Sequence, residues 1–450
     1  MFRRISAGLL LLATSAAITA QEHDHASMPG MTMEPTTSLL DMEHSMQRMD
    51  HPTSFIDSIL NHVTSGTTAE PVSTPMPMLM KHHGEWMLML HGSAFVTDTQ
   101  QSGPRGKDKF FSTNWVMPMA QRKAGPGLFT ARAMFSLEPA TITDRRYPEL
   151  FQQGETAFGQ PIVDGQHPHN FLMELAAIYD LRPSENTLVS FYAAPVGDPA
   201  IGPIAYPHRW SAAEDPIATL GHHQQDSTHI AYNVFTAGVT YRWIRVEQSG
   251  FHGGEPDEGR WQFQSSANGH GVDSYSTRVT VNPTRNWSGQ YSIAHIKAPE
   301  ASHQGEDQAR QTASVMYNLP IGKQGSMNMA PGNLAISLIW GRTRAIPDNK
   351  KQNSYTLEAL YHFAKANSVW TRMELAGRTT ELLGDSHEEP AGHVAAYTFG
   401  YDRDWHIAPH LTAAPGAQFT TYSPSPALTA AYGAHPFAVQ AFVRFRITSK

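Results

Sequence analysis

Alternation of apolar and polar residues at every second position is the feature that most constrains this chain. In "PFAVQAFVRFRI", near the C-terminus, every odd position from Phe437 to Ile447 is apolar, and the even positions include Gln440, Arg444 and Arg446. Successive side chains of a β-strand point to opposite faces of its sheet, so this pattern predicts a strand with one apolar face and one polar face.

Similar segments recur along the chain, and the stretches between them differ in length. Short interruptions occur at 182–186, 282–286, 364–367 and 403–406, whereas long ones occur at 138–171, 195–228 and 252–272. Short turns at one end and long loops at the other are typical of outer-membrane barrels, whose strands need about 9–11 residues.

We therefore predict an all-β fold, a transmembrane antiparallel β-barrel of about sixteen strands (range roughly 12–16) over residues 84–450. The alternative is a soluble all-β protein, although the chain lacks the repeat of roughly 40–50 residues that a propeller would show. In a barrel, Arg444 and Arg446 would face the lumen or the membrane interface. The side chains predicted to meet lipid include Phe437, Val439, Val443 and Phe445.

The first twenty residues resemble a targeting segment. Arg3 and Arg4 precede a mostly apolar stretch at 5–18, and small residues up to Ala20 offer a cleavage site. This is the pattern of a secretory signal peptide over residues 1–20. A formal net charge of −7 argues against a nucleic-acid partner. We expect export to an outer membrane, with membrane lipid as one partner.

Residues 21–83 form a segment rich in Met and His, which we predict to be periplasmic and largely disordered or in short helices. The whole chain has 20 Met and no Cys. Thioethers suit Cu(I), imidazole accepts Cu(I), Cu(II) or zinc, and thiols are unsuitable where they would oxidise. Copper is therefore the expected metal and zinc the second candidate. The candidate ligands are His23, His25, Met28, Met31, Met33, Met42, His44, Met46, Met49, His51, His82 and His83.

Packing is the alternative role for part of this segment. Met42, Met46 and Met49 have helical spacing and would also suit one apolar helix face. "PTSFIDSILNHV" likewise predicts a helix after Pro52. Met28 and its neighbours lie among Pro and Gly, where a ligand role is the preferred interpretation.

A second group of histidines lies in the predicted long loops, in "DGQHPHNF" and "GHHQQDSTH". Clustered His with a carboxylate has the composition of a metal site, although these residues would also serve to pin the loops inside the barrel. The candidate ligands are His167, His169, His222, His223, Asp226 and His229. The chain contains neither a Gly-x-Ser-x-Gly elbow nor a His-Glu-x-x-His motif, so we do not expect an enzyme.

The leader "HDHASMPGMTM" through "MDHP", followed by a barrel, resembles bacterial copper-resistance outer-membrane proteins. "GQPIVDGQHPHNF", "GHHQQDSTHI" and "GFHGGEPDEGRW" resemble motifs of uncharacterised outer-membrane proteins. The first resemblance implies copper tolerance, sequestration or efflux, with a periplasmic copper carrier or efflux system as a candidate partner. The alternative is a porin-like channel or structural barrel without a specific metal role.

Overall fold

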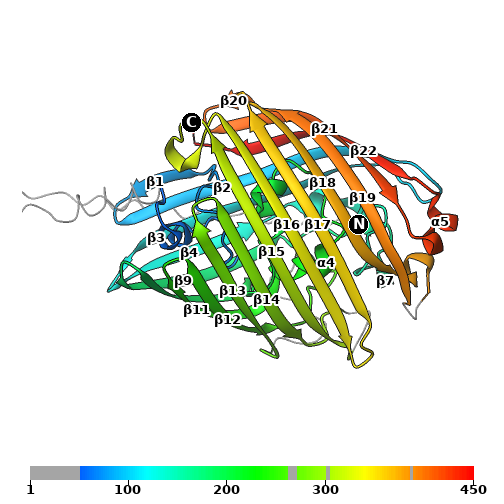
Figure 1. Ribbon diagram of the computed structural model, residues 1–450, viewed down its shortest axis with the longest axis horizontal. Helices are drawn as coiled ribbons and strands as arrows, with labels where there is room; N and C mark the ends of the chain where they lie inside the picture. The colour runs from blue at the N-terminus through cyan, green and yellow to red at the C-terminus, as the bar shows by residue number, and fades with distance from the viewer. Residues whose placement is uncertain (1–50, 262–270, 301–304, 386–388, 450) are drawn as a thin grey trace, which may run out of the picture. The chain divides into compact units, whose positions relative to one another are not determined.

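A closed β-barrel dominates the computed structural model, which describes residues 51–261, 271–300, 305–385 and 389–449. Sixteen antiparallel strands follow one another around the barrel, and the last pairs with the first (Figure 1). The predicted fold class is confirmed. The strands are β2 (Trp86–Gln101), β3 (Lys109–Ala124), β4 (Gly127–Phe135), β9 (Leu172–Ser184), β10 (Thr187–Gly197), β11 (Ala231–Tyr241), β12 (Ile244–His252), β13 (Ser274–Thr284), β14 (Trp287–Ile296), β15 (Asp307–Ile321), β16 (Gly332–Ile346), β17 (Lys351–Phe363), β18 (Asn367–Thr379), β19 (Pro390–Arg403), β21 (Leu411–Ser423) and β22 (Phe437–Ile447).

Two shorter strands extend this sheet. β1 (Leu79–His83) pairs with the start of β2, and β20 (Trp405–Ala408) continues β19 and pairs with β21. The predicted turn at 403–406 is therefore wrong, because the chain turns at 409–410. Asp404 interrupts the strand without ending it: its N–H donates to the carbonyl of Ala366 (2.7 Å) and its carboxylate accepts from Arg444 (2.9 Å). The turns predicted at 182–186, 282–286 and 364–367 are confirmed.

The two faces of the barrel differ in polarity as the alternation predicts. In β22, Phe437 and Val439 are 42% and 40% exposed on the outer face, whereas Arg444 and Arg446 are buried on the inner face. Val443 and Phe445 lie on the outer face and are half-buried. A closed barrel satisfies its backbone groups within itself, and an apolar outside with a polar inside suits insertion into an outer membrane.

Among the described residues, no helix is long and apolar enough to cross a membrane.

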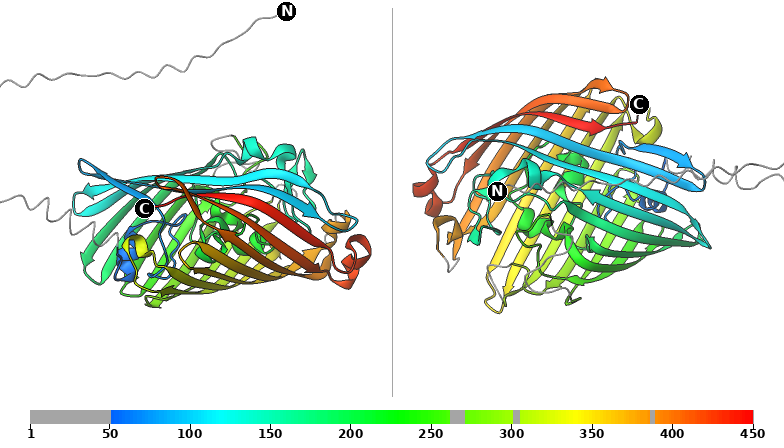
Figure 2. Two further views of the ribbon diagram at one scale, coloured as in Figure 1. Left: turned by 90° about the horizontal axis from the view of Figure 1, so that it is seen from above. Right: turned by 180° about the vertical axis from the view of Figure 1, so that it is seen from behind.

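The two ends of the barrel have connections of different length. Consecutive strands at one end are joined by short turns such as 125–126 and 242–243, whereas the loops at the other end include 136–171, 198–230 and 253–273. These three loops match the predicted long loops. Parts of them fold into the lumen, where α4 is seen among the surrounding strands (Figures 1 and 2). The short elements between the strands are α3 (Glu138–Thr141), η1 (Thr143–Arg145), β5 (Tyr147–Pro148), β6 (Thr156–Ala157), β7 (Gln160–Pro161), β8 (Gly165–Gln166), η2 (Tyr206–His208), η3 (Trp210–Ala212), α4 (His222–Gln225), η4 (Ser227–His229), η5 (Ser326–Asn328), η6 (Thr380–Leu383) and α5 (Pro426–Tyr432).

Residues 51–78, which are part of the segment predicted to be periplasmic, pack against the inner wall of the barrel. The predicted helix is present as α2 (Phe55–Leu60), whose apolar side packs with the buried Leu188 of β10. Arg132 of β4 donates to the carbonyl oxygens of His62, Thr64 and Gly66 at 2.5–2.9 Å. The buried guanidinium thus supplies hydrogen bonds to backbone carbonyl oxygens that would otherwise be buried without a partner. Residues 1–50 lie outside the described residues.

Buried ion pairs fasten loop 198–230 to the barrel wall. Arg209 makes a bidentate pair with Glu358 of β17, at 2.7 and 2.8 Å. Farther along the loop, Asp215 pairs with Arg372 of β18 at 3.0 Å, and Glu214 pairs with Arg446 of β22 at 2.9 Å. Removing one partner of a buried pair typically costs roughly 3–5 kcal/mol, so these contacts hold the loop in place.

The outer face provides a test of membrane insertion. Leu338 is 55% exposed near the middle of β16, whereas Leu319 is 37% exposed near the short-turn end of β15. Arg at a lipid-facing midplane position costs roughly 2–4 kcal/mol, but near an interface it costs at most about 1 kcal/mol. We expect Leu338→Arg to destabilise the barrel far more than Leu319→Arg in urea titrations in lipid vesicles. Equal effects would contradict the proposed membrane position of these strands.

Candidate metal sites in the barrel lumen

The two histidines of the segment "DGQHPHNF" contact different partners. Nδ1 of His167 lies 3.0 Å from the carbonyl oxygen of Pro168, and its Nε2 lies 2.6 Å from Oε1 of Glu155. His169 binds Glu138 through both its backbone N–H (2.7 Å) and its Nδ1 (3.0 Å). The intervening proline favours an extended backbone, and the two rings contribute to separate contacts.

The segment "GHHQQDSTH" forms α4 and η4, with Asp226 between them. The Asp226 carboxylate accepts from Nδ1 of His222 (2.6 Å), the N–H of Tyr206 (3.0 Å) and Arg209 (3.3 Å), while its carbonyl oxygen accepts from Nδ1 of His229 (2.8 Å). Burial opposes ionisation of Asp226, but the hydrogen bond from His222 and the charge of Arg209 outweigh it and hold its pKa well below the usual range. Asp226 is therefore a fixed anion that orients both rings.

Four imidazoles form a continuous series through the lumen. Ring centroids are 5.2 Å apart for His169 and His229, 5.3 Å for His229 and His222, and 5.4 Å for His222 and His223. Nδ1 is held by an oxygen in His169, His222 and His229. Within the described part of the chain, Nε2 of His169 and of His229 is buried without a hydrogen-bond partner. Metal-binding histidines commonly have this arrangement, one nitrogen anchored and the other available.

Burial also keeps two of these rings, and the ring of His208 in the same loop 198–230, in the form that binds metals. Removal from solvent lowers the pKa of His208, His223 and His229 well below the ordinary value, so these three rings are neutral at pH 7. Neutral imidazole is the ligand form, since a protonated ring has no free lone pair.

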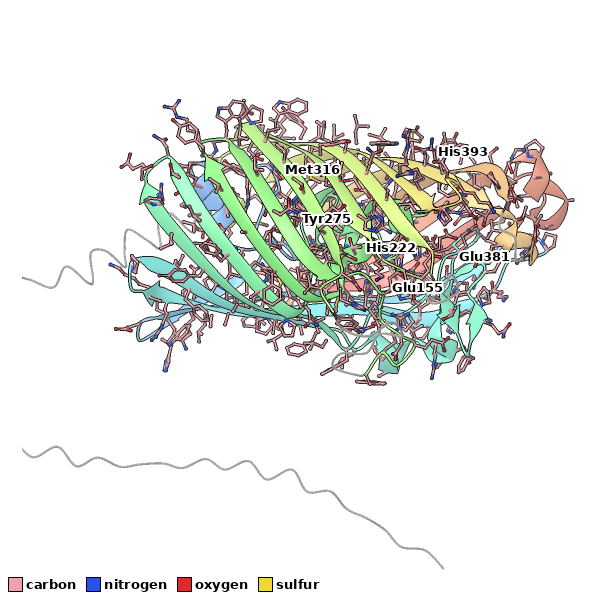
Figure 3. The ribbon with its side chains drawn as sticks, turned by 90° about the horizontal axis from the view of Figure 1, so that it is seen from below. Glu155, His222, Tyr275, Met316, Glu381 and His393 are labelled. Atoms are coloured by element: carbon pink, nitrogen blue, oxygen red, sulfur yellow. The ribbon has the colours of Figure 1, made fainter. Side chains whose placement is uncertain are left out.

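One group of potential metal ligands in the described chain consists of Glu155, His167 and His223 (Glu155 and the neighbouring His222 are labelled in Figure 3). One ligand atom from each of the three residues lies within 4.8 Å of the others. Nδ1 of His223 is buried with no partner among the residues described, and Glu155 is also paired with Arg260 at 2.5 Å. Two imidazoles and a carboxylate suit zinc, Cu(II) or Fe(II). A tetrahedral ion at about 2.1 Å from each ligand atom would need these atoms about 3.4 Å apart. The contact of 2.6 Å between His167 and Glu155 would therefore have to open.

Glu155 also lines an acidic cavity formed by the long loops. This cavity has a volume of about 590 Å³. Burial, together with the negative charges of Glu155 and Glu300, raises the pKa of Glu255 well above its usual range. Glu255 is therefore held in its uncharged form, and it is the ionised carboxylates around it that raise the local concentration of cations. The acidic side chains that line the cavity are Glu155, Glu255, Asp257, Glu258 and Glu300.

The predicted site residues fall into three groups. The loop candidates come together in the lumen, and they are His167, His169, His222, His223, Asp226 and His229. His82 and His83 lie on β1 near the short-turn end, and His51 is exposed. The candidates between residues 23 and 49 lie outside the described residues.

Glu155 was missed by the sequence analysis. It lies in "GETAF", twelve residues before His167, without a recognised ligand spacing. The hairpin of β6 and β7 and the pairing of β5 with β8 fold this loop back on itself and bring the carboxylate to the histidine.

No protein-family profile matches the sequence, and no curated protein matches it. Among solved structures, the chain is similar to an anion-selective porin from Comamonas acidovorans (11% identity, TM-score 0.48, covering 81% of this chain and 100% of the porin). It is also similar to OmpF of Salmonella typhi (9% identity, TM-score 0.49, 82% and 100% covered) and OprB of Pseudomonas putida (11% identity, TM-score 0.46, 81% and 94% covered). The resemblance to copper-resistance proteins stays a prediction.

The neutral histidines predict a loss of stability in acid. Because the folded-state pKa values of His208, His223 and His229 are lowered, the unfolded chain binds more protons below about pH 6.5, and stability falls as pH falls through that value. Gln at all three positions should flatten the dependence of the melting temperature on pH between 7.5 and 5.5. Replacing the exposed His83, His406 and His410 by Gln provides the control, and an equal flattening there would contradict the assignment.

Proposed function

We propose that this chain is an outer-membrane barrel that binds a transition-metal ion in its lumen and acts in metal tolerance, sequestration or passage. The observation that carries the proposal is the group of Glu155, His167 and His223, whose ligand atoms lie within 4.8 Å of one another. Glu155, one member of this group, also lines the acidic cavity, which supports capture of a cation from the long-loop side.

Segments of the chain fill much of the lumen, which favours a metal-binding barrel over an open channel for diffusing solutes. Loop 198–230 is bound to the wall by buried ion pairs, and residues 51–78 occupy further space beside β4 and β10. A cavity of about 90 Å³ lies in this region, lined by side chains that include Glu70, His91, His169 and His208. This volume accommodates an ion or a few waters.

A porin-like channel or a structural barrel is the second candidate function. The closed sixteen-strand architecture and its charged inner wall favour it, because large water-filled barrels share both features. Under this alternative, the histidines pin the loops, and solute flux would require loop 198–230 to leave its ion pairs. Liposome swelling distinguishes the two candidates: rapid swelling with small sugars would support the channel and contradict an occluded barrel.

Binding of zinc tests the lumen site. We expect the full-length protein to bind one Zn²⁺ at this site. The double variant His167→Gln with His223→Gln should abolish this binding, because each substitution removes one imidazole ligand. Isothermal titration should be carried out with His23, His25, His44 and His51 replaced by Gln in every protein, which removes binding by the leader.

His406→Gln with His410→Gln is the matched control, since both side chains are exposed at the short-turn end. Unchanged zinc binding in the His167/His223 variant would refute the site. Equal loss in the control variant would show that the measured binding occurs elsewhere.

Copper binding by the leader is a separate part of the proposal. In the sequence, Met28, Met31 and Met33 follow closely after His23 and His25, and thioether with imidazole suits Cu(I). Replacing the three Met by Leu keeps bulk and apolarity, so the variant should lose Cu(I) affinity and copper tolerance while the barrel still assembles. A competition assay with a Cu(I) chelator measures the affinity, and an unchanged value would favour packing over ligation.

A further inference from the structure

The inner side of the barrel carries a large cluster of methionines. Most of them lie toward the short-turn end, and two, Met134 and Met173, lie beside loop 136–171. Nine buried methionines belong to one apolar cluster, and two more, Met80 and Met329, pack against it. Together they are eleven of the 20 in the chain. The buried members are Met76, Met78, Met87, Met89, Met117, Met119, Met134, Met173 and Met327. We call this set with Met80 and Met329 the methionine cluster.

Strand register brings the thioethers of the cluster into rows. Met80 of β1 is paired with Met89 of β2, and Met89 is paired with Met119 of β3. Directly opposed side chains on neighbouring antiparallel strands have Cβ atoms about 4.5–5.5 Å apart. Three thioethers on adjacent strands therefore lie side by side on the inner face.

Histidines with unpaired ring nitrogens flank this central row. His82 is paired with Met87 on one side, and His91 is paired with Met117 on the other. Both ring nitrogens of His82 and Nε2 of His91 are buried and lack a hydrogen-bond partner within the described residues. A buried polar atom without a hydrogen-bond partner lowers the stability of the folded protein, so its presence indicates a binding site for a ligand or another partner.

A third histidine already contacts a sulfur of the cluster. Nε2 of His208 lies 3.1 Å from Sδ of Met134, and Nδ1 of His208 is buried without a partner in the described structure. His208, His91 and Met76 all line the cavity of about 90 Å³, which His169 of the imidazole series also lines. The methionine cluster and the loop histidines thus border the same space.

Packing alone is a weak account of this composition. Leu, Ile and Val have better-defined rotamers and fill regular cores, whereas methionine serves as an occasional filler of irregular gaps. The inward faces of membrane barrels are normally polar. A run of thioethers with unpaired imidazoles on that face instead matches the ligand preference of a soft monovalent metal ion.

We propose that the methionine cluster is a binding site for Cu(I) or Ag(I), with Met80, Met89 and Met119 as the central ligands and His82 or His91 completing the coordination. The site uses different residues from Glu155, His167 and His223 and prefers a different ion. Either site can therefore fail its test without affecting the other.

Silver binding by the full-length protein tests this proposal without redox chemistry. In every protein, Met28, Met31, Met33, Met42, Met46 and Met49 are replaced by Leu, which silences the leader. Equilibrium dialysis with silver nitrate and elemental analysis then gives the number of Ag(I) ions bound. We expect Met89→Leu with Met119→Leu to lose about one Ag(I) per chain, because leucine preserves packing but has no sulfur donor.

Met316→Leu with Met373→Leu is the matched control, since both residues lie on strands outside the cluster. Silver binding at the parent level by the Met89/Met119 variant, or an equal loss in the control, would overturn the proposal. X-ray absorption at the silver edge on the leader-silenced parent provides a readout that needs no change in the cluster. Two or three sulfur neighbours are expected, and an oxygen and nitrogen shell alone would also overturn it.

Discussion

Closure of the barrel between β2 and β22 is the constraint on which the rest of the structure depends. The two strands pair from Ser93 with Arg446 to Gln101 with Ala438, and this seam removes the free edges of the sheet. Without a closed ladder, the backbone groups of the edge strands would be unpaired in lipid, at a cost of several kcal/mol each. Closure also separates an outer face that must be apolar from an inner face that can hold charges.

Because the inner face of the barrel is enclosed, the parts of the long loops that fold into the lumen pack against the barrel wall. Arg209 links loop 198–230 to the barrel wall, because it binds Glu358 of β17 and also Asp226 within its own loop. Asp226 in turn orients His222 and His229. The positions of these imidazoles therefore depend on a buried guanidinium and on the strand that carries its partner, beyond any local preference of the loop sequence.

The two ends of the lumen offer different ligand chemistry. Carboxylates and imidazoles gather at the long-loop end around Glu155, and thioethers gather near the short-turn end around Met89 and Met119. Borderline divalent ions prefer the first set, and soft monovalent ions prefer the second. This division is the basis of the two separate metal sites proposed above.

The sequence by itself determined the class of fold, the alternation of faces and the ends with short and long connections, because a period of two residues is a local property. It also singled out His167 and His223, whose residue type alone is informative. Only the tertiary structure decided that Glu155 joins them, that residues 51–78 lie against Arg132, and that Met80, Met89 and Met119 form one row. These contacts depend on strand register and on ion pairs between residues more than a hundred positions apart, such as Arg209 with Glu358, which no local pattern specifies.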